Sequence, residues 1–437
     1  MSTRFSLRDV SLLFALLAIA AYFTYALRDP GQAVFYEGNP FLSARTLSQL
    51  VVEVSITAML AVGMLLVILP GHIDLAAGSG VGLIGGLATV LINGTGWVTQ
   101  SLTAFHEFIR ATFGPEAAAW CPPPPWPDPV AMAFAFIVAA VFWGLMGMLI
   151  VRQRIQAFIV TLGGMLIFKG LFWDVIGNRT IAVSGPSQGK TWSLVAGTET
   201  YTIPQDWMRR LATEYVEPKL GLIAAGVIVL LMLIVRMRAW ARRKRLAMEG
   251  DDFELTLIKW MIAAQLIFIG VLVANQYKGV PLPAVIFGAV AFIVHTLTRH
   301  TRFGRHLYAI GGNEEAAVLS GIRVQSVTVW AFILMGGIVA ITGFMQTAYT
   351  GSTTTDIGNL MELDAVAACV IGGVALKGGR GTVMNVFLGA LIMATLAKGM
   401  SLMGTEPQQK YMVRGAVLVL AVWLNTRMNR TGRGSLA

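Results

Sequence analysis

Apolar runs of about 20 residues recur along this chain, and they constrain its fold more than any other feature. A helix of that length crosses the hydrocarbon core of a bilayer. Only 13% of the residues are charged, against about a quarter in soluble domains. We therefore predict an all-α polytopic membrane protein with about twelve transmembrane segments, some of them short or broken. The segments are 10–27, 49–69, 75–92, 130–151, 156–177, 219–235, 256–274, 282–298, 326–349, 364–376, 382–403 and 411–426.

The basic residues predict how these segments are oriented. Lys and Arg collect in short loops between apolar runs, which is the pattern of cytoplasmic loops and needs no nucleic acid partner despite the net charge of +10. We expect residues 1–437 to form one transmembrane domain with both termini inside. The cytoplasmic loops would be 236–254 and 299–325, and the long polar loops 93–129 and 178–218 would be periplasmic.

The loop 299–325 carries the most distinctive polar segment. Asn313 stands where a helix N-cap belongs, and Glu314 and Glu315 follow in the first turn, where carboxylates offset the helix dipole. Gly321 suits a C-terminal cap. The pattern predicts a short capped helix over 314–320 that presents a face to a soluble partner.

This segment also carries a family resemblance. Glu315, Ala316, Ala317 and Gly321 form an E-A-A-x-x-x-G pattern, which resembles the coupling loop of permease subunits of ATP-driven bacterial importers. The wider wording FGRHLYAIGGNEEAAVLSGIRV resembles ribose/xylose-type sugar permeases. So do ANQYKGVPLPAVIF, ELDAVAACVIGG and MATLAKGMSLMG. The extra apolar pair around 236–254 is similar to the xylose-type members, which implies a ten-span core plus two spans.

The resemblance implies a set of partners. They are a second copy of the permease, a cytoplasmic ATP-binding subunit and a periplasmic sugar-binding protein, all at the bacterial inner membrane. It assigns contact with the ATPase to the helix and its caps, and it implies no cofactor. The substrate, a monosaccharide and more narrowly a pentose such as xylose, follows from the resemblance alone. The ATPase contact comprises Asn313, Glu314, Glu315, Ala316, Ala317 and Gly321.

Charged and polar residues in or beside the spans are candidates for a translocation path. Asp74, in PGHIDLAAGSG, either lines the path or caps a helix starting at Leu75. This wording resembles a family signature from which Ala76-Ala77-Gly78-Ser79 departs, removing one hydroxyl. Ser79 remains a path candidate.

Three further charges join the path candidates. Glu53 and Lys169 fall within spans, where a charge costs on the order of 3 kcal/mol and usually faces the bundle interior. Each is either a path residue or one member of a structural ion pair. Asp364, with Glu362, is either a path residue or a helix cap.

Gly-rich segments predict close helix contacts or broken helices. A helix, a polar turn and a Gly-rich helix occur twice, over 57–92 with a turn at 70–74 and over 364–400 with a turn at 377–381. This suggests two related halves flanking one path.

Two other classes of function stay open on sequence grounds. An ion-coupled secondary transporter of a small polar solute would need intramembrane carboxylates such as Glu53 and Asp174. A receptor or assembly factor that has lost transport is the other. An ATPase is not expected, because GPSQGKT (185–191) has one residue too few between its glycines for a phosphate-binding loop.

Overall fold

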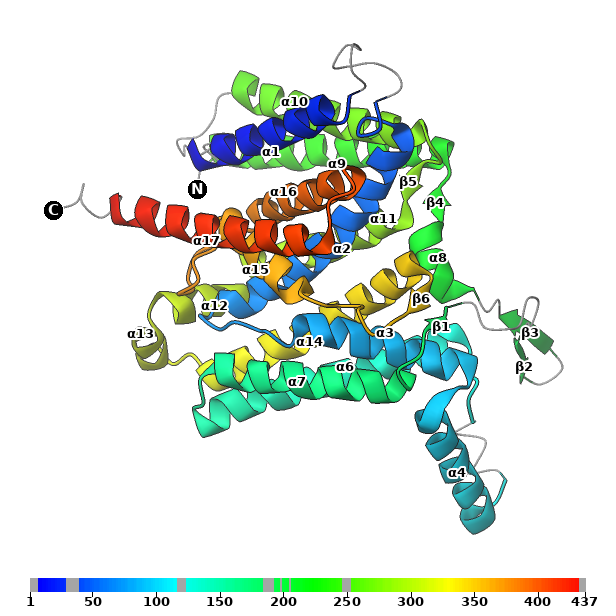
Figure 1. Ribbon diagram of the computed structural model, residues 1–437. Helices are drawn as coiled ribbons and strands as arrows, with labels where there is room; N and C mark the ends of the chain where they lie inside the picture. The colour runs from blue at the N-terminus through cyan, green and yellow to red at the C-terminus, as the bar shows by residue number, and fades with distance from the viewer. Residues whose placement is uncertain are drawn as a thin grey trace.

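A computed structural model describes residues 7–28, 39–115, 123–183, 192–196, 199–203, 206–245 and 253–431. The segment 185–191, with its apparent phosphate-loop motif, lies outside these ranges. Most of the described chain is helical, and the long helices run side by side (Figure 1). The helices are α1 (Leu7–Ala26), α2 (Ala44–Ile68), α3 (Ala77–Asn93), α4 (Gly96–Phe113), α6 (Asp128–Gln153), α7 (Ala157–Ile176), α8 (Trp207–Thr213), α9 (Pro218–Arg245), α10 (Phe253–Asn275), α11 (Leu282–His300), α12 (Arg302–Gly312), α13 (Glu314–Leu319), α14 (Val324–Thr350), α15 (Met361–Ile371), α16 (Val383–Leu402) and α17 (Pro407–Thr431).

The predicted fold class is confirmed, and each of the twelve predicted segments overlaps a helix. Within the described residues, eight helices are long and apolar enough to cross a membrane. The pair α3 and α4, bent by 56°, adds a ninth if it is counted as one span. Capping residues explain where several of these helices begin. Ser43 caps α2 by accepting from Thr46 N, and Thr382 caps α16 by accepting from Asn385 N.

One predicted boundary is wrong in an informative way. The short span predicted over 364–376 extends beyond the helix, since α15 ends at Ile371 because Gly372 and Gly373 follow, the latter with φ of 83°. Its 11 residues span only about 16 Å. The chain from 372 to 382 is non-helical and reaches the turn predicted at 377–381.

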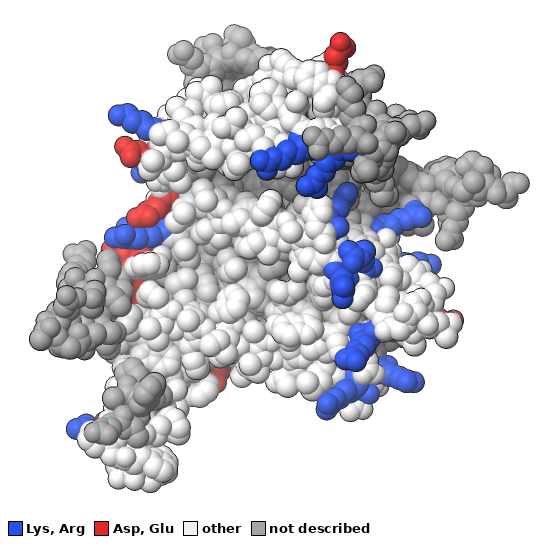
Figure 2. All heavy atoms as spheres, turned by 180° about the vertical axis from the view of Figure 1, so that it is seen from behind, with Lys and Arg blue, Asp and Glu red and all other residues white. Residues whose placement is uncertain are grey.

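The molecule has two edges of different character (Figure 1). At the edge we call the strand edge lie α4, α8 and three two-stranded antiparallel sheets. At the opposite edge, which we call the basic edge, lie α12, α13 and the C-terminal end of α17. Most Lys and Arg side chains visible in Figure 2 lie on the side away from α4. The sheets pair β1 (Ile181–Ala182) with β6 (Ser352–Thr353), β2 (Trp192–Ala196) with β3 (Glu199–Ile203), and β4 (Tyr215–Val216) with β5 (Val280–Pro281).

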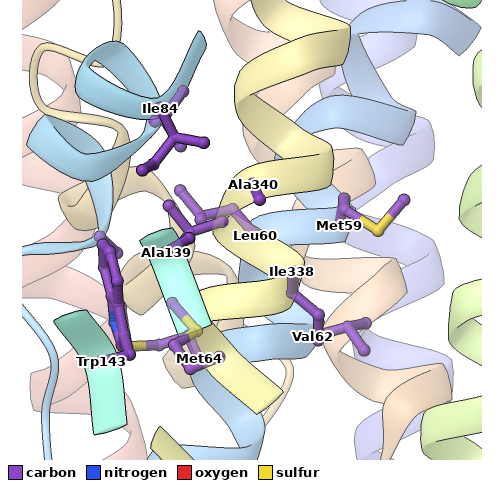
Figure 3. Packing of buried hydrophobic residues seen from close by; sticks show 14 of the residues in the cluster. Met59, Leu60, Val62, Met64, Ile84, Ala139, Trp143, Ile338 and Ala340 are labelled. Atoms are coloured by element: carbon purple, nitrogen blue, oxygen red, sulfur yellow. The ribbon is translucent and has the colours of Figure 1, made fainter. Parts of the chain in front are cut away.

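The core lies where α2, α3, α6 and α14 meet (Figure 3). Met59, Leu60 and Met64 of α2 pack there with Ile84 of α3 and Trp143 of α6. The glycines of α3 allow the approach, as the sequence predicts. A Cβ added at Gly80 would overlap the Trp143 ring, and one at Gly85 would overlap the Thr347 hydroxyl.

Two sets of four helices pack in a similar pattern. The first set is α2, α3, α6 and α7, and the second is α14, α15, α16 and α17. In the first set α3 packs against α6 and α7, and in the second α15 packs against α16 and α17. The central helices α2 and α14 contact each other and each packs on the other set: α14 on α3 and α6, α2 on α15 and α16. Two related halves are therefore present in the packing. They relate α2 and α3 to α14 and α15, rather than 57–92 to 364–400.

Candidate functional site

The short helix α13 at the basic edge has the caps that its sequence predicts. Asn313 Oδ1 accepts a hydrogen bond from Ala316 N at 3.0 Å. Gly321 follows the helix with φ of 79°, and Ile322 N donates to Ala317 O at 3.1 Å. The predicted capped helix is confirmed, with its end at Leu319.

The exposed face of α13 combines carboxylates with apolar side chains. Ala317 is buried against the body of the protein, whereas Glu314 and Glu315 are exposed. Leu319 is 89% exposed and Val318 is 55% exposed. Adjacent exposed apolar side chains such as Val318 and Leu319, flanked by charged residues, are typical of a protein contact surface.

A tight backbone contact joins the helix before α13 to the membrane helices. Gly379 N donates to Leu69 O, at the end of α2, at 2.9 Å. A Cβ at Gly311 of α12 would overlap Leu69 O and Gly379 N, and one at Gly378 would lie 2.8 Å from the Gly311 Cα. We call Leu69, Gly71, Gly311, Gly378 and Gly379 the glycine junction. It brings three chain segments together with no room for a side chain.

One side chain reinforces the glycine junction, and a second lies close to it along the chain. The Tyr308 hydroxyl of α12 donates to Gly381 O at 2.7 Å. Burial raises the pKa of the Tyr308 phenol, although Arg299 acts against this, so the hydroxyl remains a donor. His72 lies in the turn after α2. Burial lowers the pKa of the His72 imidazole, and the nearby Glu314 carboxylate acts in the opposite direction. This places the start of α13 near that turn.

The N-termini of α3 and α15 meet inside the bundle. A Cβ added at Gly78 would overlap Glu362 Oε2 and would lie close to Gly358 O. Gly358 belongs to the non-helical segment that leads into α15. We call this contact the paired N-termini. Helix N-termini carry partial positive charge, so two of them facing one another favour polar groups between them.

Asp74 lies just before α3, but it is not the N-cap predicted for a helix at Leu75. The helix begins at Ala77. Asp74 Oδ1 accepts from Ala76 N at 2.9 Å, and Oδ2 accepts from the Trp143 indole at 2.6 Å. Asp74 is fully buried. Its carboxylate therefore fixes the segment entering α3 to α6. Ser79 is half-buried one turn further on, and its hydroxyl donates to Ala76 O at 3.1 Å.

Lys169 approaches the paired N-termini from α7, and Asp364 lies in the first turn of α15 itself. Lys169 of α7 lies within electrostatic range of Glu362, and its Nζ is 5.6 Å from the Trp173 ring centre. Asp364 makes an ion pair with Arg414 of α17 at 3.4 Å. The predicted capping role is wrong for this end of α15, because its N-cap residue is Leu360 and no side chain caps it.

Glu53 belongs to a separate cluster near the strand edge. Its Oε1 accepts from Lys398 Nζ at 2.9 Å and from the Tyr349 hydroxyl at 2.7 Å. Lys398 Nζ also donates to Gln49 Oε1 at 3.0 Å. This cluster ties α2 to α14 and α16, which supports the structural alternative for Glu53.

Sequence reasoning missed the partners in these contacts. Lys398 sits within an apolar span, so a search for opposite charges within spans would have proposed it as a partner for Glu53. Trp143 and Arg414 gave no comparable signal. Among the residues that the structure describes, no three His, Cys, Asp or Glu side chains are grouped so as to hold a metal ion.

Comparison with known proteins gives a consistent result. Residues 46–422 match the family model described as "Branched-chain amino acid transport system / permease component". The chain is 33% identical to the xylose transport system permease protein XylH of Haemophilus influenzae, over 97% of this chain and 98% of that protein. It is 30% identical to XylH of Escherichia coli K12 over 95% of this chain and 91% of that protein. The ribose import permease protein RbsC of E. coli K12 is 26% identical over 89% and 87%. No solved structure matches.

Proposed function

The chain belongs to the branched-chain amino acid transport system / permease component family, and we propose that it is the membrane permease subunit of an ATP-driven importer of a monosaccharide. The observation that carries this proposal is the likeness to XylH, which extends over 97% of the chain. The subunit transports and does not hydrolyse ATP, a step that belongs to a separate ATP-binding subunit. We take the substrate to be a pentose such as xylose.

The ATP-binding subunit would dock on α13. Glu314 and Glu315 offer charge, and Val318 and Leu319 offer apolar surface, all accessible from the basic edge. Asn313 and Gly321 fix the helix ends, and Ala317 anchors the helix to the body. The basic edge would then be cytoplasmic, in agreement with its Lys and Arg content.

Movement of the ATPase would reach the membrane helices through α12. The glycine junction connects the end of α12 to the end of α2 and to the segment between α15 and α16. Both connections lie beside a helix of the paired N-termini. Along the chain, α3 follows Leu69 and α15 precedes Gly378. A displacement of α13 would therefore bias the paired N-termini between two arrangements. Coupling requires only that ATP and sugar bind these arrangements with different affinity.

The paired N-termini are the candidate for a sugar path. Asp74, Ser79, Lys169 and Asp364 lie on the segments that surround them, and non-helical backbone is tolerated at membrane depth where it lines a polar cavity. In this proposal Lys169 is the side chain that meets the sugar. Asp74 and Asp364 hold the segments in place through Trp143 and Arg414. Glu53 acts as a structural charge.

The remaining partners follow from this assignment. A sugar-binding protein would dock on the strand edge, which would be periplasmic and includes the described parts of loops 93–129 and 178–218. Two permease chains would pair in the bacterial inner membrane. The loops 236–254 and 299–325 would face the cytoplasm, and residues 1–437 would form one membrane domain.

Uptake into liposomes tests the proposal against its alternatives. The permease is reconstituted with its ATP-binding subunit and binding protein. We expect xylose entry to need internal ATP and to survive a protonophore, with leucine excluded. Entry that collapses with the protonophore while ATP remains would favour the ion-coupled alternative. Leucine entry without xylose entry would reject the sugar assignment.

A further inference from the structure

A pocket of about 580 Å³ opens at the strand edge where α3 bends into α4. Its volume falls in the range of small-molecule sites, about 300–1,000 Å³. Its walls are the end of α3, the start of α4, the end of α7 and β1. The hydrogen-bonding and aromatic side chains that line it are Asn93, Thr95, Trp97, Gln100, Arg179 and Thr180.

Contacts on several sides hold the pocket open. Asn93 Nδ2 donates to Ala182 O at 2.9 Å, which joins α3 to β1. Ile181 pairs with Thr353, so β1 is fixed to β6. A Cβ at Gly96 would lie 3.2 Å from Val175 O, so α4 starts in close contact with the end of α7. The walls thus come from elements that are bonded to one another, and a ligand would meet a largely formed site.

The lining combines a ring platform with side chains that donate and accept hydrogen bonds. The Trp97 side chain is 47% exposed, enough to stack on a ligand ring. Within the described residues the side chains of Gln100 and Arg179 have no hydrogen-bond or ion-pair partner. The Gln100 amide offers both a donor and an acceptor, and Arg179 offers donors only.

This combination selects a class of ligand. The Gln100 amide needs both a donor and an acceptor from the ligand, whereas Arg179 needs an acceptor. A hydroxyl group is both. The phosphodiester of a lipid headgroup is an acceptor only and does not satisfy the Gln100 carbonyl oxygen. Ring hydroxyls together with an apolar ring face to lie on Trp97 describe a monosaccharide.

We propose that this pocket is a monosaccharide-binding site at the strand edge, separate from the path at the paired N-termini. Trp97 stacks on the sugar ring, and Arg179 and Gln100 bind its hydroxyls. The choice of a pentose as probe rests on the proposed function, whereas the pocket's preference for a ring polyol does not.

The test measures D-xylose binding to the full chain in lipid nanodiscs, with neither ATP-binding subunit nor binding protein present. Saturation-transfer NMR and Trp fluorescence report the affinity. We expect Trp97→Ala to weaken binding about tenfold and Arg179→Gln to weaken it less. The matched control is Trp207→Ala, because Trp207 is a 52% exposed indole at the same edge, on α8. It should bind like the unaltered chain.

Three results would overturn the proposal. They are no xylose binding at millimolar concentration, binding that Trp97→Ala leaves unchanged, and quenching of Trp97 by brominated phospholipid that xylose does not relieve. The last result would identify a lipid site. Failure of liposome uptake with Trp97-dependent binding intact would count against the proposed function and not against this site.

Discussion

Gly311 and Gly321 lie ten positions apart at the basic edge, in opposite surroundings. Gly311 is enclosed by Leu69, Gly378 and Gly379, so even a methyl group has no place there. Gly321 has nothing within 4 Å of an added Cβ, and its requirement comes from its φ of 79° alone. One glycine is needed for packing and the other for backbone conformation. The edge therefore contains a tightly closed contact at Gly311 and an open, exposed helix end at Gly321.

Whole helices show the same contrast. In the most apolar stretch of α2, 83% of residues are buried, whereas none of the described side chains in that of α10 is buried. Helix α10 packs mainly on α9. This pair, which the resemblance marks as an addition to a ten-span core, lies outside the centre. Changes in buried α2 and at the enclosed glycine junction should affect folding. Changes in α13, which is exposed, should instead affect coupling.

The largest expected effect on folding is at Gly311, the enclosed glycine. Gly311→Ala places a Cβ against two backbone groups that cannot move independently, and overpacking of this kind costs about 1–3 kcal/mol or more. We expect strongly reduced membrane abundance and a lower melting temperature of the purified protein. Gly312→Ala is the matched control, since a Cβ there meets nothing within 4 Å. Equal stability of the two variants would show that the junction is not closed.

A smaller effect is expected at the Glu53–Lys398 ion pair. Lys398→Met leaves the partly buried Glu53 charge with only the Tyr349 hydroxyl, at a cost of about 2 kcal/mol. Glu53→Gln combined with Lys398→Met should recover most of the lost stability, because no isolated charge remains. The melting temperatures of the single and double variants measure this coupling. Additive losses would indicate that the two residues act separately.

The sequence predicts best what is determined locally. The caps of α13 depend on residues within the same short segment, so Asn313 and Gly321 could be identified without a fold. The apolar segments were found because hydrophobicity over about 20 residues is itself a local property. The predicted end at 376 is wrong because the apolar run includes Gly372 and Gly373, which interrupt the helix.

Contacts between distant parts of the chain cannot be predicted from local sequence patterns. Asp74 and Trp143 are 69 positions apart, and Glu53 and Lys398 are 345 apart. Nothing local indicates that the N-termini of α3 and α15 meet, because a glycine at 78 suits any close contact. For the same reason neither alternative for Asp74, path residue or helix cap, includes the bond that its second carboxylate oxygen accepts from Trp143 of α6. Pairing of this kind depends on the fold.

The most direct test of the account measures sugar uptake and ATP hydrolysis by the complete reconstituted importer with Gly321→Val in the permease. Valine is strained at a positive φ, by about 1–3 kcal/mol, and would distort the end of α13 at its open surface. Gly321→Asn is the control, because Asn tolerates this conformation. The account predicts normal abundance of both variants. With valine, uptake should be lost and ATP hydrolysis should no longer respond to loaded binding protein. Near-normal uptake with valine at Gly321 would contradict the assignment of α13 as the coupling helix.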